Sequence, residues 1–165
     1  MANEGGYADD PVDRGGKTIY GIASRYHPGW FNTVHDAYKN GQRASAKRLA
    51  KKFYRSKFWN DNYDSIEDTS LAFRLFDFGV NAGVKKSVKI LQESVNYINR
   101  RKLLTVDGDF GLHTLTACNM LIQESLYLLF TIKIYLFYLK RPTAWKHLRG
   151  WTLRLLKRYW LKETK

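Results

Sequence analysis

Cysteine is nearly absent from this 165-residue chain, in which Cys118 is the single example. No disulfide can therefore form within the chain, so its stability does not depend on an oxidising compartment. Long apolar runs are absent too, because the most apolar stretch, residues 125–139, is interrupted by Lys133. That stretch is shorter than the roughly 20 residues that a membrane-spanning helix needs. We expect a buried core helix there, with contact at a membrane interface as the alternative.

Acidic residues are scarce beside basic ones, since 28 lysines and arginines outnumber 15 aspartates and glutamates and give a net charge of +13. This excess indicates a polyanionic partner, which could be nucleic acid, an anionic membrane surface or an anionic cell-wall polymer. No recognised nucleic-acid-binding motif is present, so we expect no nucleic acid. The four histidines show no HxxxH-type pairing, and we expect neither a metal nor another cofactor.

The spacing of apolar residues predicts an all-α protein. Val84, Val88, Leu91, Val95 and Ile98 recur at steps of four and three and form the clearest helical stripe. Helices are predicted over residues 18–28, 44–59, 69–81, 84–100, from about 113 to Pro142, and 150–161, with a short one after Thr33. No long strand alternation is present, although the glycines near Gly15 are compatible with a short hairpin.

A glycine-rich segment at the start of the chain gathers four acidic residues: Glu4, Asp9, Asp10 and Asp13. A glycosidase needs one protonated carboxyl to donate to the leaving oxygen, and often an ionised one to activate water. Glu4 beside Tyr7, and Asp13 near the following glycines, would supply that asymmetry. The alternative is an acidic loop in which the aspartates cap turns and Thr18 caps the next helix. Calcium is disfavoured, because the spacing of the acidic residues does not match a calcium loop.

The stretch EGGYADDPVDRGGKTIYGI, residues 4–22, resembles the opening of glycoside hydrolase family 108, the lysozyme-like N-acetylmuramidases common in bacteriophages and prophages. The resemblance implies that Glu4 is the general acid, with Asp13 as base and Thr18 as a water-positioning hydroxyl. Tyr20 and Trp30 could stack on sugar faces, although such aromatic residues are more often packed in the core. The expected substrate-binding residues are Gly5, Gly6, Tyr7, Asp10, Gly16, Tyr20, Trp30 and Asn81.

The segments LAFRLFDFGVNAG, LQESVNYIN and VDGDFGLHTLTACN, within residues 71–119, resemble the helical peptidoglycan-binding module of the family's C-terminal half. The resemblance implies a catalytic half over residues 1–70 and a peptidoglycan-binding half over residues 71–165, packed as one compact unit. Sugar contact by the turn that begins at Asp107 is the less favoured reading, because Asp-Gly turns are ordinary between helices.

The resemblance further implies a monomeric endolysin-type muramidase, which hydrolyses the β-1,4 bond between N-acetylmuramic acid and N-acetylglucosamine in peptidoglycan. Because the chain opens without a secretory signal, we expect synthesis in a host cytoplasm and action on the cell wall or periplasm after release. The basic C-terminal helix is expected to pack on the bundle through Trp151 and Leu155, and contact with anionic outer-membrane lipid is the alternative. Family members usually carry another helix before the EGG motif (Glu4, Gly5 and Gly6). Only three residues precede the motif in this sequence, so a catalytically weakened wall-binding protein of the same fold stays as an alternative. The net positive charge leaves a basic nucleic-acid-binding helical protein as another.

Overall fold

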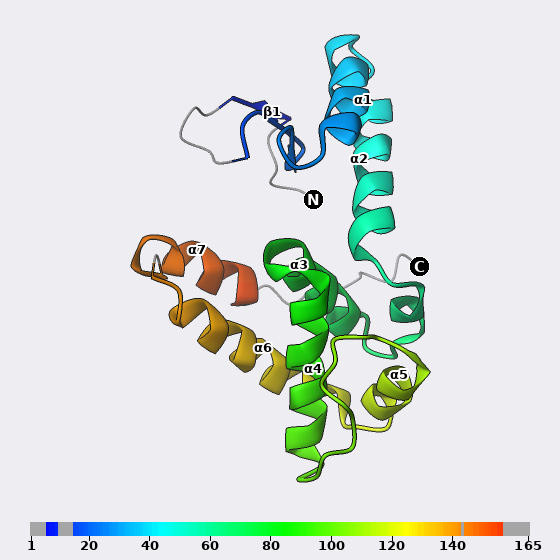
Figure 1. The fold of residues 1–165 in the computed structure, drawn as a ribbon, viewed down its shortest axis with the longest axis vertical. Coiled ribbons are helices and arrows are strands. Elements are labelled where there is room, and N and C mark those ends of the chain that lie inside the picture. Colours follow the sequence, from blue (N-terminus) through cyan, green and yellow to red (C-terminus); the bar gives the residue numbers. More distant parts are fainter. Residues whose placement is uncertain (1–5, 10–14, 143, 157–165) are drawn as a thin grey trace. The chain divides into compact units, whose positions relative to one another are not determined.

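The computed structural model describes residues 6–9, 15–142 and 144–156. The chain divides into two compact units, Met1–Lys57 and Phe58–Lys165 (Figure 1). Helices dominate the described residues, and their one small sheet lies in the first unit. The all-α prediction is thus confirmed, together with a short hairpin beside the glycine-rich segment. The predicted functional division at residue 70 concerns activity, and it stays a prediction.

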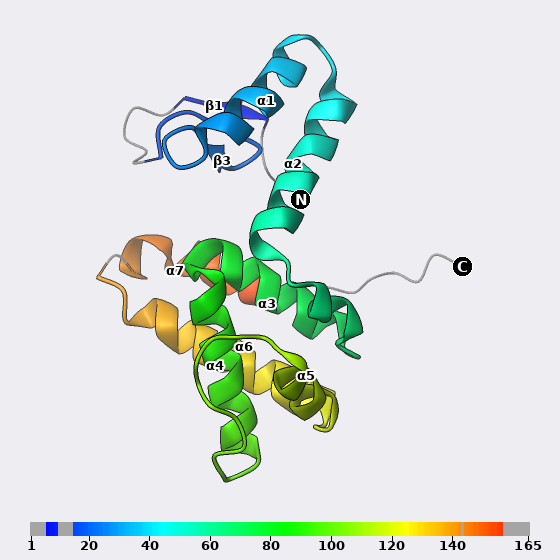
Figure 2. The same cartoon turned by 45° about the vertical axis from the view of Figure 1, so that its right-hand side comes forward.

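The first unit begins with a three-stranded antiparallel sheet of β1 (Tyr7–Ala8), β2 (Thr18–Ile19) and β3 (Ile22–Ala23), in that order. Helices α1 (Pro28–Lys39) and α2 (Arg43–Phe58) follow the sheet (Figure 2). The buried hydrophobic side chains come from the sheet and from both helices, so these elements share one small core. They are Ile19, Ile22, Phe31, Val34, Ala46, Ala50, Phe53 and Tyr54.

The helix predicted over residues 18–28 is wrong, because residues 18–23 form the β2–β3 hairpin. Its turn consists of Tyr20 and Gly21, whose φ values are 48° and 80°. Positive φ at both central residues is the geometry of the two-residue turns that suit the twist of a hairpin. The turn makes Ile19 and Ile22 cross-strand partners, so a spacing typical of a helix face here joins two strands. Thr18 lies in a strand and is not a helix cap.

Pro28, interpreted from the sequence as the end of a helix, is the first residue of α1. Proline suits the first helical turn, because its missing N–H would have no partner inside the helix there. The short helix predicted after Thr33 is the second half of α1. Helix α2 confirms the prediction for residues 44–59 to within one residue, and its Phe53 and Tyr54 are buried as expected.

In its described residues, the second unit contains a short 3-10 helix, η1 (Asp61–Ser65), and five α-helices that begin within it. These are α3 (Thr69–Ala82), α4 (Val84–Ile98), α5 (Leu112–Asn119), α6 (Gln123–Leu139) and α7 (Ala144–Leu156). Gly83, at φ 94°, ends α3 as predicted and precedes α4. The core of the unit is built mainly by α3, α4 and α6, and includes Leu71, Leu75, Phe78, Leu91, Phe130 and Ile134.

The single long helix predicted up to Pro142 is instead two helices, α5 and α6, which are bent by 115° at their break. Gln123 stabilises the break, because its side-chain amide donates to the carbonyl oxygens of Cys118 at 3.0 Å and of Leu121 at 3.2 Å. Neither helix alone, nor any other helix in the described part of the chain, is long and apolar enough to cross a membrane. Taken together as a bent pair, α5 and α6 meet that test by length and composition.

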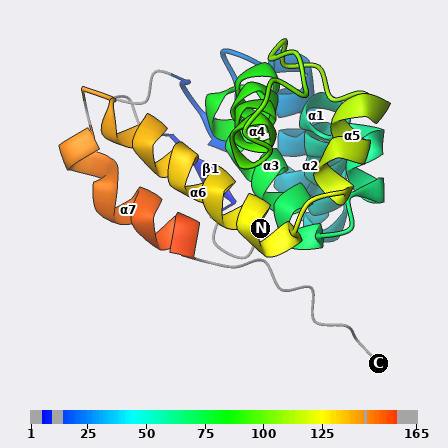
Figure 3. The ribbon, with the colours of Figure 1, turned by 90° about the horizontal axis from the view of Figure 1, so that it is seen from below.

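Helix α6, expected to be a core helix, buries only one of its faces. The opposite face carries a row of aliphatic side chains that are 41–57% exposed, namely Leu128, Ile132, Leu136 and Leu139. Their steps of four, four and three place them on one stripe of the helix. Helix α7 lies beside α6 (Figure 3), where Trp151 stacks on Tyr138 with 4.6 Å between ring centroids.

A buried arginine joins α3 to the end of α7. Arg74 donates hydrogen bonds to the carbonyl oxygens of Arg154 at 3.2 Å and Leu155 at 2.8 Å, and to the Tyr127 hydroxyl at 2.8 Å. Carbonyl groups in the last turn of a helix lack intrahelical partners and carry the negative end of its dipole, so a cation there is favourable. Leu155 is itself buried, which makes α7 part of the core.

Candidate active site

Antiparallel pairing brings the strand that follows the EGG motif next to the segment GGKT. Ala8 on β1 pairs with Thr18 on β2. Beside this pair, the Tyr20 N–H donates to the Gly6 carbonyl oxygen at 2.8 Å. Thr18 therefore lies on the strand adjacent to the one that continues from the motif. The predicted site residues Glu4, Gly5, Asp10 and Asp13 lie outside the described residues, and their roles stay predictions.

Gly6 packs against the ring of Tyr38, on α1. A Cβ atom at this position would lie 2.5 Å from Tyr38 Cε2, which is closer than such atoms approach. The ring is also held from other sides, because the Arg43 guanidinium carbon lies 3.2 Å from its centroid and the Tyr20 ring meets it edge-on at 5.9 Å. Glycine is therefore needed at position 6 as long as Tyr38 keeps its place. No sequence signal indicated Tyr38, since its contact with the motif arises only from folding.

Tyr7, 37% exposed, extends the same cluster. Its ring lies 5.2 Å from that of His35, which in turn stacks on Phe31 at 5.2 Å. The Tyr7 hydroxyl donates to Asp9 Oδ2 at 3.3 Å, and Lys17 Nζ lies 3.4 Å from the same oxygen. The hydrogen bond and charge of Asp9 raise the pKa of Lys17. Asp9 is thus engaged by two neighbours.

The remaining predicted substrate-binding residues occupy different environments. Gly16 has a φ of 72°, which glycine adopts without strain. Trp30 is half-buried and packs at 5.7 Å from Phe53 of α2, so it has a packing role. Asn81 lies in the second unit, where its amide donates to the Asp77 carbonyl oxygen at 2.6 Å and accepts from Arg154 at 3.0 Å. Sugar contact by these residues stays a prediction.

In the second unit, Gln92 fixes the turn over residues 105–111. Its amide donates to Asp107 Oδ1 at 2.9 Å and to the Asp109 carbonyl oxygen at 3.0 Å. Its side-chain oxygen accepts from the Gly108 N–H at 2.9 Å. The Asp109 N–H also donates to Asp107 Oδ1, and this bond and that of Gln92 lower the pKa of Asp107. The turn is therefore held rigidly on α4.

A groove of about 500 Å³ opens beside this turn. Its lining combines the carboxylates of Asp107 and Asp109 and the ring of His113 with the apolar side chains of Leu103 and Met120. Polar groups can hydrogen-bond sugar hydroxyls while apolar groups cover a sugar face, so the groove is a candidate glycan contact. Within residues 6–9, 15–142 and 144–156, no three His, Cys, Asp or Glu side chains form a metal-binding group.

The family model described as Glycosyl hydrolase 108 matches residues 1–83, just over half of the chain. The chain belongs to glycosyl hydrolase family 108. It is thus a member of a glycoside hydrolase family, and the resemblance drawn from the EGG motif is confirmed. The family 108 match covers the sheet, α1, α2, η1 and α3. No curated protein sequence matches the chain.

A solved structure described as "Structure of Brucella abortus SagA" is similar to this family 108 chain, with a TM-score of 0.68 and 24% identity. The similarity covers 93% of this chain and 83% of the other. At this level of identity, the likeness shows the fold. The mostly helical, lysozyme-like fold expected from the resemblance is confirmed.

Proposed function

We propose that this family 108 chain is an endolysin-type muramidase that hydrolyses the β-1,4 bond between N-acetylmuramic acid and N-acetylglucosamine in peptidoglycan. The family match over residues 1–83, with the EGG motif at its start, carries the proposal. The fit of Gly6 against Tyr38, and the pairing that places Thr18 beside the motif strand, support it. The net charge of +13 suits an anionic polymer as substrate.

In the proposed reaction, the protonated carboxyl of Glu4 donates its proton to the glycosidic oxygen as the bond from that oxygen to the anomeric carbon breaks. Asp13 accepts a proton from a water molecule, and the oxygen of that water attacks the anomeric carbon. The Thr18 hydroxyl orients the water by hydrogen bonding. Glu4 ends ionised and Asp13 protonated, and proton exchange with solvent restores both. The anomeric form of the product distinguishes this single displacement from a route in which Asp13 is the nucleophile.

The experiment is the substitution Glu4→Gln, measured by the release of reducing ends from purified sacculi and by the turbidity of permeabilised Gram-negative cells. General acid catalysis contributes typically about 10²–10⁴-fold, so the rate is expected to fall by that factor at unchanged melting temperature. Asp9→Asn is the matched control. Asp9 is paired with Lys17, and its substitution is expected to leave the rate nearly unchanged. A near-normal rate for Glu4→Gln contradicts the assignment.

The same preparations separate the alternatives. A wild-type chain that binds sacculi and releases no reducing ends is the catalytically weakened wall-binding protein. Retention on duplex DNA with no affinity for sacculi supports the nucleic-acid-binding alternative. Gel filtration tests the proposed monomer.

We also propose synthesis in a host cytoplasm, release to the cell wall or periplasm, and contact of the C-terminal helix with anionic outer-membrane lipid. Exposed side chains on α7 support the lipid contact, since Trp145, Leu153 and Leu156 are 77%, 51% and 74% exposed. Lys and Arg residues around such apolar groups favour an anionic surface. The full chain is expected to sediment with anionic vesicles and not with neutral ones, and high salt should release it.

A further inference from the structure

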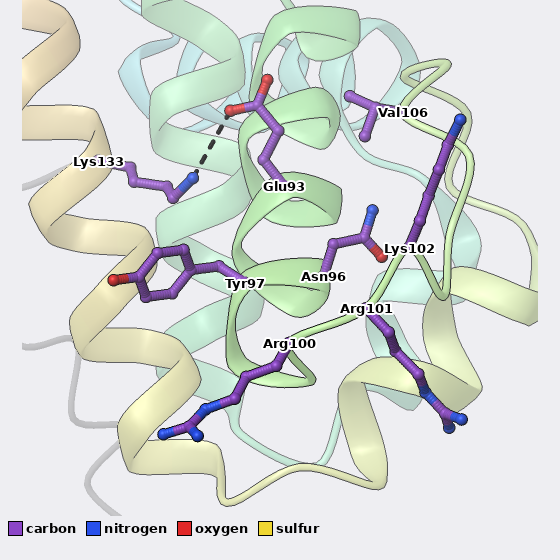
Figure 4. A pocket seen from close by; sticks show the side chains of 8 residues that line it. All are labelled: Glu93, Asn96, Tyr97, Arg100, Arg101, Lys102, Val106 and Lys133. Atoms are coloured by element: carbon purple, nitrogen blue, oxygen red, sulfur yellow. Dashed lines mark ion pairs between the residues drawn. The ribbon is translucent and has the colours of Figure 1, made fainter.

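A cationic pocket of about 740 Å³ surrounds the C-terminal turn of α4 in the second unit (Figure 4). Its lining includes four cations, of which Arg100, Arg101 and Lys102 are consecutive and Lys133 comes from α6. Lys133 Nζ lies 3.7 Å from Glu93 Oε2 and is paired with it. No ion pair links the three consecutive cations to a carboxylate within the described part of the chain. The pocket therefore presents a net positive charge.

An exposed aromatic ring lies among these cations. Tyr97 is 69% exposed, and Lys133 Nζ lies 5.7 Å from the centroid of its ring. The ion pair with Glu93 joins α4 to α6 and keeps Lys133 beside the ring. Figure 4 shows that Tyr97 and Arg100 both extend from the α6 side of α4. An aromatic face with cations beside it can stack on an apolar sugar face while the cations bind carboxylates.

The backbone at Arg100 is the second observation. Its φ is 52°, in the left-handed region that favours glycine. The Arg100 N–H donates to the Tyr97 carbonyl oxygen at 3.1 Å, and the Arg101 N–H donates to that of Asn96 at 3.3 Å. This pair of bonds is the helix ending in which glycine is usual. The helix dipole favours cations in this region, but it does not account for arginine at the glycine position. Strained residues of this kind gather at binding sites.

The loop that carries the cations is fixed in place. The Asn96 side chain donates to the Leu104 carbonyl oxygen at 2.8 Å and accepts from the Leu104 N–H at 2.7 Å. Leu104 is buried, which anchors the far end of the loop in the core. Arg101 and Lys102 therefore lie on a segment held at both ends, and their backbone does not need to be ordered when a ligand binds.

We infer that this pocket binds a carboxylate-bearing glycan strand, with a sugar ring on Tyr97 and a carboxylate on Arg100. The inference rests on the proposed function, because the peptide stems of peptidoglycan supply such carboxylates. The volume lies within the range of small-ligand sites. The second unit thereby holds the polymer through a contact that is separate from the reacting bond.

The test measures sedimentation of the full chain at low temperature with three insoluble polymers: purified sacculi, sacculi with amidated carboxylates, and chitin. Tyr97→Ala and Arg100→Gly are expected to weaken binding to sacculi by about ten-fold, the loss of one good contact. Lys86→Gln, which removes an exposed charge on the same helix outside the pocket, is the control and should change binding less than two-fold. Amidated sacculi and chitin should bind the wild-type chain about as weakly as native sacculi bind Arg100→Gly.

Two further measurements separate the effects of these substitutions on folding and on catalysis from their effect on binding. Arg100→Gly should melt at the same temperature as the wild type or higher, since glycine adopts this φ without cost. It therefore decides the matter if Tyr97→Ala folds poorly. Both variants should hydrolyse a short soluble glycan at the wild-type rate, because such a substrate does not need the second contact.

Wild-type binding by both pocket variants overturns the inference, and so does a loss no larger than that of Lys86→Gln. Equal affinity for native and amidated sacculi overturns the role of carboxylates. Binding of the same variants to anionic vesicles and to duplex DNA is measured in parallel. If the pocket variants lose affinity only for the vesicles or only for the DNA, the pocket binds a phosphate-bearing partner and the inference is overturned. A chain that binds sacculi through Tyr97 and releases no reducing ends overturns the proposed function and supports the site.

Discussion

Replacing Gly108 by alanine tests whether the close approach of the turn over residues 105–111 to α4 stabilises the second unit. The φ of Gly108 is 83°, and a side chain in this region costs roughly 1–2 kcal/mol. Its Cβ would also lie 2.5 Å from Lys85 Cγ and 2.6 Å from the Lys85 carbonyl oxygen. The lysine side chain can move away, whereas the carbonyl belongs to the first turn of α4 and moves only if the helix or the turn shifts. Overpacking of this kind costs typically about 1–3 kcal/mol.

The sum of the two costs predicts that Gly108→Ala lowers the free energy of unfolding by about 2–5 kcal/mol. Urea unfolding followed by circular dichroism measures this change. Gly41→Ala is the matched control, because Gly41 has a φ of 75° and no atom within 4 Å of the added Cβ. Gly41→Ala should lower the free energy of unfolding only by the cost of the positive φ, roughly 1–2 kcal/mol. If Gly108→Ala costs no more than Gly41→Ala, the close approach to Lys85 is not a constraint and the reasoning is refuted.

Three further predictions concern pH, reactivity and the active site. Hydrogen bonds from Asp109 and Gln92 lower the pKa of Asp107 below 3.8, so its contribution to stability is complete above that value and declines as the pH falls through the lowered pKa. Asp107→Asn should remove this part of the acid dependence of the urea midpoint. Burial raises the pKa of the Cys118 thiol to about 12, so a thiol reagent should modify it only as the chain unfolds, and rapid labelling of the native protein would contradict this. Gly6→Ala should lower both the melting temperature and the rate of sacculus hydrolysis, and the double variant Gly6→Ala/Tyr38→Leu should regain part of each loss.

The sequence predicted the helices that bury one regular stripe of apolar side chains. Helices α3 and α4 match their predictions to within two residues, because apolar side chains at helical spacing must face a core. The turn at Tyr20 escaped prediction, since a tyrosine rarely adopts positive φ and nothing local requires it there. The break between α5 and α6 contains neither glycine nor proline. It depends on a side-chain cap from Gln123, which only the folded chain shows.

The candidate site was predictable to the extent that it lies in one continuous motif. The glycines that follow Glu4 indicated that this segment forms the site, and the resemblance to family 108 supplied the catalytic roles of its residues. Tyr38 contacts this segment from α1, and Lys133 reaches the pocket at Tyr97 from α6. Such contacts depend on tertiary packing, and no spacing in the sequence encodes them.

The burial of Arg74 has a consequence for the order in which the chain folds during its synthesis. The carbonyl groups that accept its hydrogen bonds lie 80 and 81 residues further along the chain. At a translation rate of about 5–20 residues per second, they are made about 4–16 seconds after Arg74. Until then the guanidinium cannot make these two hydrogen bonds, so the contact between α3 and the end of α7 forms only after synthesis has reached α7. Nascent chains stalled between α6 and α7 lack these two bonds and should be cleaved within α3 more readily than the released protein.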